Sequence, residues 1–238
     1  MATLNLLYKK EYKVNEFIKV RIPTVGEVID HEDDYYSMVS MLTAMPIDMM
    51  VQLDDIGIDF TKINEYELFI LMFSALKERD TSLIFGDLDL KAFKSVINPQ
   101  NNMLVLRDKD TGAMIDRAIQ GQIAATLRKI HHLKRDNRKP INGETKDYLI
   151  ERARTKMRRN KNRTTNSQLE ELVVALVNTE QFHYGFEGTR ELSIYQFNES
   201  VHQIIKKIDY DNRMHGIYSG TVSAKDLSQD DLNWLTHK

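Results

Sequence analysis

Hydrophobic positions along this chain recur mainly at helical spacing, with Pro, Gly and Asn between the repeats. Apolar side chains at i, i+3 and i+4 predict amphipathic helices, and Asn or Ser just before a stripe predicts where a helix begins. Asn64, Ser167 and Ser193 occupy such positions. The four clearest stripes are Tyr66, Phe69, Phe73 and Leu76; Ile119, Ile123, Leu127 and Ile130; Leu169, Leu172, Val173 and Leu176; and Ile194, Phe197, Val201, Ile204 and Ile208.

Strand patterns are fewer and shorter. The opening segment alternates loosely and turns at Pro23 and Gly26, which predicts one or two short strands before Val28. Two apolar runs, 103–106 and 113–115, flank a turn containing Gly112 and predict a β-hairpin. Residues 86–102 are rich in Asp, Gly, Pro and Asn and predict irregular structure. Because helices outnumber strands and are not interleaved with them, we expect an α+β fold, mainly α-helical, with a small β-hairpin and short N-terminal strands.

This pattern divides the chain into four regions. We expect short strands in 1–30, an acidic helical body in 31–127 with the hairpin near 103–117, a basic helical arm in 128–163 and a helical region in 164–238. The last region is expected to end in a helix that Ser228 caps and that carries Leu232 and Trp234. These regions make either one compact domain or two subdomains.

The bulk composition is that of an ordinary globular protein, with 42% hydrophobic and 29% charged residues. There is no cysteine in the 238 residues, which excludes disulfides and thiolate metal sites. The first residues lack the pattern of a signal peptide, and the longest apolar run, Leu68–Phe73, is too short to span a bilayer. We therefore expect a cytoplasmic protein without a membrane partner.

Charge is distributed unevenly along the chain. Residues 128–163 hold fourteen of the thirty-three Lys and Arg against four acids, a net of +10, whereas the whole chain sums to −2. On a helix over 144–163 an apolar strip of Leu149, Ile150, Ala153 and Met157 predicts one docked side. The rest of the surface carries the candidate partner-binding cations Arg152, Arg154, Lys156, Arg158, Arg159, Lys161 and Arg163.

Three partners fit such a basic helix: nucleic-acid phosphates, an acidic protein surface, or the acidic body of the same or a neighbouring copy. Nucleic-acid sites usually combine cations with exposed aromatic side chains, and here Tyr148 is the one candidate. This favours protein contact or self-association over nucleic acid.

Five of the eleven methionines lie between Met38 and Met50. If one helix continued past Met45, the side chains of Met38, Met41, Met45 and Met49 would share a face. Methionine-rich surfaces adapt to varied apolar partners, so this face is a candidate partner-binding surface. The alternative is ordinary core filling at helical spacing.

Catalytic and cofactor motifs are missing from the sequence. The chain contains no phosphate-binding GxxxxGK[ST], dinucleotide-binding GxGxxG, nucleophile-elbow GxSxG or metal-binding HExxH pattern. Adjacent His131 and His132 diverge by about 100° on a helix and do not chelate one metal together. We therefore expect a non-enzymatic protein without metal or cofactor.

Several stretches resemble proteins of the tail modules of long-tailed phages and prophages of Gram-positive bacteria. They are Ile22–Gly26, Gly57–Phe60, Leu169–Thr179, Ser193–Asn198, Tyr210–Asp211, Gly216–Thr221 and Asp231–Trp234. Within these modules the chain is most similar to tail assembly chaperones. That resemblance implies a cytoplasmic, oligomeric helical protein that binds the tape-measure protein while tail tube subunits polymerise. A minor virion component from the same modules is the alternative, and the resemblance assigns no individual site residue.

Overall fold

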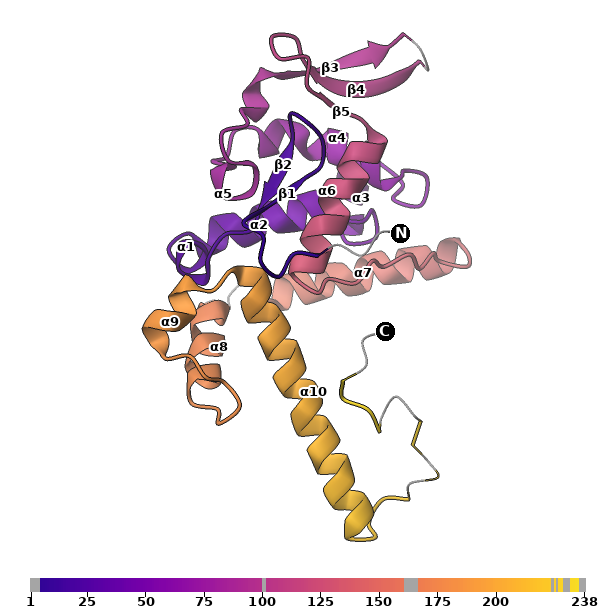
Figure 1. The fold of residues 1–238 in the computed structure, drawn as a ribbon. Coiled ribbons are helices and arrows are strands. Elements are labelled where there is room, and N and C mark those ends of the chain that lie inside the picture. Colours follow the sequence, from indigo (N-terminus) through magenta and orange to yellow (C-terminus); the bar gives the residue numbers. More distant parts are fainter. Residues whose placement is uncertain are drawn as a thin grey trace.

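Asn64, Ser167 and Ser193 begin three helices of this chain where the sequence predicts. Together the helices build a body from which one long helix projects (Figure 1). The computed structural model describes residues 5–99, 102–160, 167–223, 225, 227, 228 and 232–235. The elements in chain order are β1 Glu11–Lys13, β2 Lys19–Arg21, α1 Val25–Ile29, α2 Glu32–Thr43, α3 Met50–Asp55, α4 Glu65–Leu76, α5 Ser82–Phe85, the 3-10 turn Leu90–Ala92, β3 Phe93–Asn98, β4 Met103–Asp108, β5 Met114–Ile115, α6 Arg117–Ile130, α7 Gly143–Asn160, α8 Gln168–Val177, α9 Phe186–Glu191 and α10 Ile194–Tyr218.

The described strands form two small antiparallel sheets, β1–β2 and β3–β4–β5. In the second sheet β4 pairs with β3 from Phe93↔Asp108 to Asn98↔Met103 and with β5 at Leu106↔Ile115. Helices dominate the rest, which confirms the predicted α+β, mainly helical class. In the described ranges no helix is both long and apolar enough to cross a membrane.

The main hydrophobic core joins both ends of the chain. It gathers buried side chains from β2, α1, α2, α4 and α6, and it also takes Leu169 and Val173 of α8 and Ile194 and Phe197 of α10. Backbone hydrogen bonds reinforce this joint, because Val25 N donates to Leu192 O at 2.8 Å and Ile194 N donates to Pro23 O at 2.8 Å. The C-terminal helices are therefore part of the same core as the N-terminal strands.

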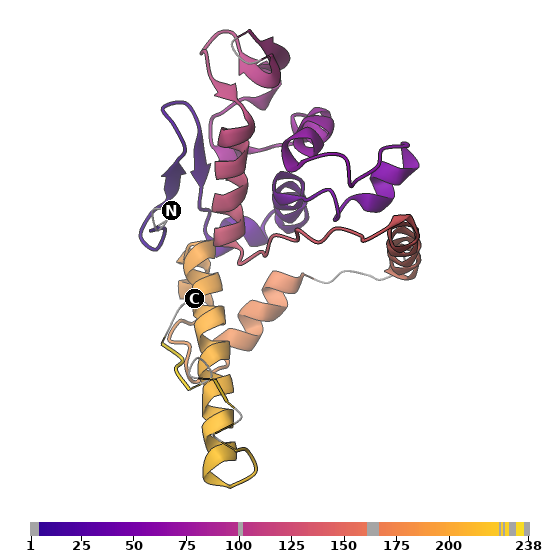
Figure 2. The ribbon, with the colours of Figure 1, turned by 90° about the vertical axis from the view of Figure 1, so that its right-hand side faces the viewer.

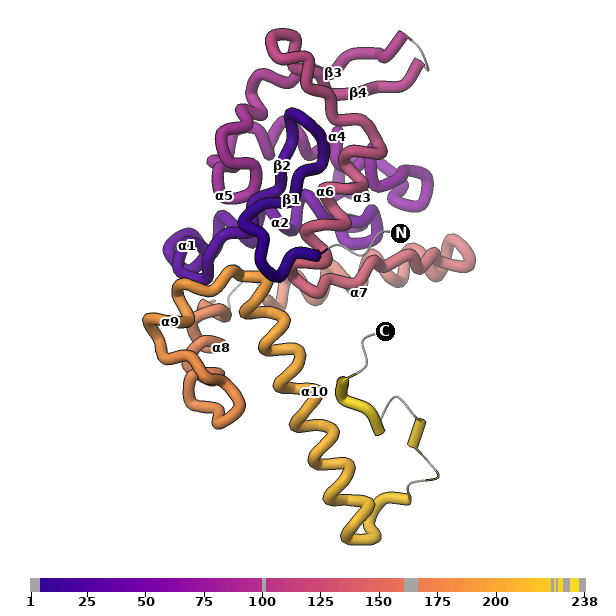
Figure 3. The backbone as a smooth tube through the Cα atoms, in the orientation of Figure 1, coloured from indigo at the N-terminus to yellow at the C-terminus, as the bar shows by residue number. Residues whose placement is uncertain are grey.

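α10 leaves this core after its first turns. Its buried residues in the described chain are Ile194, Tyr195, Phe197 and Ile204, all in the first half of the helix. Two views at right angles show the second half extending away from the body (Figures 1 and 2). Earlier in the chain, residues 131–142 connect α6 to α7 and form no helix or strand (Figure 3).

One buried ion pair connects three helices of the body. The Arg128 guanidinium, near the end of α6, donates to Glu65 at the start of α4 and to the carbonyl oxygen of Thr43 at the end of α2. The side chains of Arg128 and Glu65 are 12% and 10% exposed. Arg135 reaches the second oxygen of the Glu65 carboxylate at 2.7 Å. Arg128 is therefore a structural residue of the body, although its charge lies in the segment that we predicted as the basic arm.

Helix starts follow the sequence, with one exchange of partner. Ser193 forms the expected capping box with Gln196, and Asn64, expected as a simple cap, forms one with Glu67. At α8, the Ser167 hydroxyl accepts from Glu170 N at 2.9 Å. The carboxylate that joins this cap belongs to Glu32 of α2 and not to Glu170. Glu32 accepts from Ser167 Oγ and, at 3.0 Å, from Leu169 N.

Two expectations about local structure are wrong. Strand β3 occupies Phe93–Asn98, inside the segment predicted as irregular, because β4 supplies a full row of backbone partners. The helix expected after Ser228 does not form at 232–235, where Leu232 and Trp234 lie in turns. The hairpin of β4 and β5 is confirmed.

Replacing Arg128 by Met should destabilise the body by about 3 kcal/mol, because it leaves the buried carboxylate of Glu65 with Arg135 as its remaining cation. Urea unfolding measures this loss. Lys129→Met is the matched control on the same helix and should have a small effect. Equal losses for the two variants would contradict a structural role for Arg128, whereas combining Arg128→Met with Glu65→Gln should recover part of the stability.

Candidate protein-binding groove and basic helix

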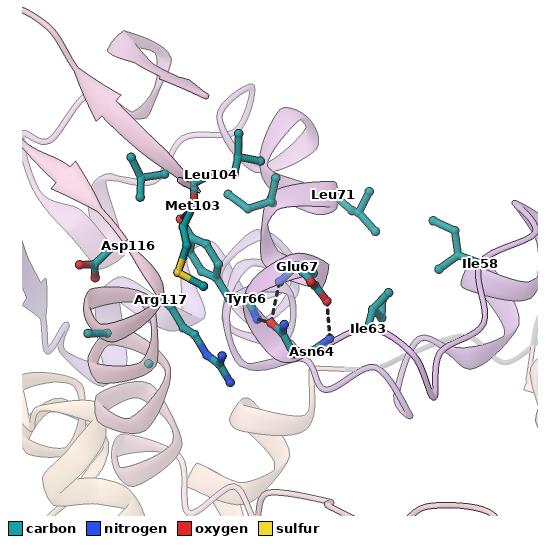
Figure 4. A pocket seen from close by; sticks show the side chains of 14 residues that line it. Ile58, Ile63, Asn64, Tyr66, Glu67, Leu71, Met103, Leu104, Asp116 and Arg117 are labelled. Carbon is teal, nitrogen blue, oxygen red and sulfur yellow. Dashed lines mark hydrogen bonds between the residues drawn. The ribbon is translucent and has the colours of Figure 1, made fainter. Parts of the chain in front are cut away.

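A broad apolar groove lies between α4, strand β4 and the start of α6. Its cavity volume is about 1080 Å³. Figure 4 shows that side chains from the loop before α4 continue the groove away from the sheet. The apolar side chains that line it include Ile58, Ile63, Ile70, Leu71, Leu104 and Val105.

Tyr66 fixes the sheet against α4 at the inner end of the groove. Its hydroxyl donates to the carbonyl oxygens of Leu104 at 3.1 Å and Ile115 at 2.9 Å. Burial, helped by the charge of Asp116, raises the pKa of Tyr66 to about 12, so the donor stays protonated at neutral pH. This anchor sets the distance between strand β4 and helix α4, and hence the width of the groove.

Apolar side chains at the groove remain open to solvent. Leu71 is 49% exposed, Met103 52% and Leu104 42%. Large apolar side chains gathered at a concave surface usually mark a site for a partner rather than a packing defect. One sequence signal points to this site, the apolar pair Met103 and Leu104 at the hairpin, but no signal indicates which helix faces them.

Apart from exposed Arg117, the polar groups at the groove already have structural partners. The Asn64 side chain accepts from Tyr66 N and Glu67 N, while Glu67 accepts from Asn64 N at 2.8 Å. Asp116 caps α6 by accepting from Ile119 N at 2.8 Å. No group of three His, Asp or Glu side chains placed to hold a metal ion occurs in the part of the chain that the structure describes. The arrangement suits binding of apolar surface.

The basic helix α7 docks on an acidic edge of the same chain. Ile150 is buried against a second hydrophobic cluster formed by Ala44, Leu53, Phe60 and Leu68. Arg154 contacts Asp54 and Asp55 at 2.6 Å each, and Lys146 reaches Asp59 at 3.1 Å. Hydrogen bonds from Thr61, and after them the one from Lys146, lower the pKa of Asp59 to about 2. Part of the predicted charge pairing therefore takes place within one chain.

The other side of α7 points to solvent. At 100° per residue, Arg152, Lys156 and Arg159 lie on the side away from Ile150. All three are exposed, and no ion pair joins them to any described residue. Arg158 lies to one side and approaches Glu151 of the same helix at 3.8 Å. Lys161 and Arg163, predicted as part of this arm, lie outside the described residues. We call Arg152, Lys156 and Arg159 the outward stripe.

The methionines do not form the predicted surface. α2 ends at Thr43, so Met45 and Met49 do not continue the helical face of Met38 and Met41. Met38 is 1% exposed and Met45 8%, and both serve as buried core residues. Met41 and Met49 are half-buried and pack against the two hydrophobic clusters. Core filling, the alternative to a binding surface, describes Met38 and Met45.

Comparison with known proteins relates the C-terminal part of the chain to a protein family. A protein-family model described as the YomV second domain matches residues 159–238, the final third of the chain. This match indicates a phage- or prophage-associated protein. The matched segment contains α8, α9 and α10, whereas the groove residues lie before it. No match was found among curated proteins or among solved structures.

Docking of α7 should depend more on apolar burial than on its ion pairs. Ile150→Ala should cost about 2 kcal/mol, because it removes buried side-chain atoms from the second cluster. Arg154→Ala should cost less, and its effect should shrink with added salt, since Asp54 and Asp55 are about half-exposed. Urea unfolding at low and high salt checks both. A larger, salt-insensitive loss for Arg154→Ala would contradict this order.

Proposed function

We propose that this chain is a non-enzymatic phage tail-morphogenesis protein that binds an apolar helical segment of the tape-measure protein in the groove between α4 and the hairpin. The observation that carries the proposal is the groove itself, with Leu71, Met103 and Leu104 open to solvent at its surface. An amphipathic helix that lays its apolar side into such a groove is a common mode of protein recognition.

The lining of the groove favours an apolar helix over a polar small molecule. Its volume of about 1080 Å³ lies at the upper end of the ~300–1,000 Å³ typical of small-ligand pockets. The lining is mostly aliphatic, and its Asn64, Glu67 and Asp116 side chains are engaged in helix capping. A client segment would therefore be held by burial of its apolar side chains, with little demand for a fixed sequence.

The assignment to tail assembly draws on two further observations. The match to the YomV second domain supports a phage setting. The resemblance of the stretches quoted above to tail assembly chaperones supplies the client, a long protein with apolar helices that needs to stay soluble before the tail tube surrounds it. Action in the host cytoplasm, before the particle is complete, forms part of this proposal.

Charging the groove should abolish client binding without unfolding the protein. Leu71→Asp combined with Leu104→Asp should change the free energy of unfolding by about 1 kcal/mol per site, since both side chains are about half-exposed. Co-expression with the tape-measure protein of the same phage should then leave that protein insoluble, whereas the unmodified chain keeps it in the supernatant.

Val174→Asp is the matched control for this experiment. Val174 is 48% exposed on α8, close to the exposure of Leu71, but it lies outside the groove. The control should retain the client. A double groove variant that melts normally and still keeps the client soluble would refute the proposed site.

A second candidate function, binding of nucleic acid, is favoured by the outward stripe. Arg152, Lys156 and Arg159 follow one side of α7 with exposed Tyr148 beside them. The same stripe also fits an acidic protein surface, including that of a second copy of this chain. A single aromatic side chain is too few to stack several bases. We propose a protein contact, with self-association that weakens as salt is added.

Titration of the protein with short DNA and RNA separates these partners. At physiological salt we expect no binding tighter than about 1 µM, the weak range of non-specific electrostatic contact. Tighter, steeply salt-dependent binding that disappears in the Arg152→Gln, Lys156→Gln, Arg159→Gln variant would establish nucleic acid instead. The control that removes equal charge elsewhere is Lys91→Gln, Lys94→Gln, Lys109→Gln. Light scattering of the same variants over a salt series tests self-association.

A further inference from the structure

Histidines form the joint between the body and α10. His131 and His132 directly follow α6, and the first turns of α10 pack on them. Asn198 donates to the carbonyl oxygen of Ile130 at 2.9 Å and lies 3.5 Å from His131 Nδ1. The rings of His132 and His202 stack with centroids 5.0 Å apart. Polar contact between the end of α6 and α10 therefore combines one backbone carbonyl with imidazole rings.

The hydrogen bonds around His131 require a neutral ring. The Ile130 carbonyl fixes the Asn198 amide nitrogen, so the group that faces His131 Nδ1 is a donor and Nδ1 accepts. The proton then resides on Nε2, which donates to the Tyr35 hydroxyl at 2.9 Å. Protonating Nδ1 would turn two N–H donors toward each other. Burial, with a smaller contribution from His132, lowers the pKa of His131 from 6.5 to about 4.

The groups around the joint offer His131 no compensating charge. On α2, burial raises the pKa of Tyr35, and it raises that of Tyr36 to about 12, so both rings stay neutral. Glu32 near them is engaged by Ser167 and Leu169 N. On α6, Arg128 is paired with Glu65, and Lys129 adds positive charge.

On α10, the carboxylate is Glu199, which lies 3.7 Å from His132 Nε2. Burial, and after it the hydrogen bond to Glu199, raises the pKa of the Tyr195 hydroxyl. His132 adds strain, because its φ of 51° lies in the left-handed region.

We propose that this histidine joint is a pH-sensitive hinge: it fixes the direction of α10 at neutral pH and loosens on acidification, while Ile194 and Phe197 keep the start of the helix in the main core. Opening exposes His131 to water, where it titrates near its ordinary value, and relieves the backbone of His132. The hinge is independent of what occupies the groove, so it stands or falls separately from the proposed client.

The direction follows from linkage. The pKa of His131 is about 4 in the closed joint and 6.5 in the open joint, so protonation favours the open joint. The free energy of closure is therefore fully present above pH 6.5 and decreases as the pH falls toward 4. Between about pH 7.5 and about pH 5 the ratio of open to closed molecules should rise roughly 30-fold from His131 alone.

Spin-label distances measure this opening in the full chain. The sequence has no cysteine, so Ala75→Cys on α4 and Asn212→Cys in the outer half of α10 give two defined labels. We expect one narrow distance distribution near pH 7.5 that gains a second, broader population by about pH 5, while circular dichroism retains the helical signal. A distribution that does not change over this range would overturn the proposal.

His131→Gln removes the titration and keeps an amide donor toward Tyr35. Its distance distribution should stay narrow at low pH, whereas the control His215→Gln, exposed on outer α10, should open like the unmodified chain. If His131→Gln does not fold, Asn198→Asp replaces it, because a carboxylate beside Nδ1 stabilises the protonated ring in the closed joint and should move opening to lower pH. Opening that is identical in all variants would refute a role for His131.

Discussion

The buried ion pair of Arg128 and Glu65 determines how the helices of the body meet. One guanidinium near the end of α6 contacts the first residue of α4 and the last carbonyl of α2, so three helix ends converge on it. A charged group so little exposed is stable only while its partners stay in place. Side chains of α4 and α6 line the groove, so the distance between these helices determines its shape. The position of the α6 end determines where α10 packs. Both features thus depend on one arginine.

Several basic side chains of this protein form ion pairs with acidic side chains of the same chain. The basic helix α7 contacts Asp54, Asp55 and Asp59 of its own body with its inner cations, and Ile150 anchors it in a small cluster. What remains for a partner is the outward stripe, a smaller surface than the sequence suggests. A strong local excess of charge therefore does not measure the charge that a partner meets.

Local patterns predicted the elements and not their associations. The capping boxes at Asn64 and Ser193 and the apolar stripe of α6 placed three main helices correctly, because each signal lies within a few neighbouring residues. β3 was missed because its pairing with β4 stabilises a segment of weak strand propensity. The groove and the histidine joint depend on contacts between segments far apart in sequence, and no single-sequence pattern reports those. The methionine prediction failed because α2 ends before Met45.

The pairing of Pro23–Val25 with Leu192–Ile194 has a consequence for synthesis. The nascent chain releases β2 and α1 long before their partners exist, and at roughly 10 residues per second the ribosome needs about 17 s to travel from Thr24 to Ser193. During that interval Val25 and Val28 lack the cover of Ile194 and Phe197. Closure of the main core is therefore a late event, and a truncated chain that ends before α10 would leave the ribosome with an open hydrophobic face.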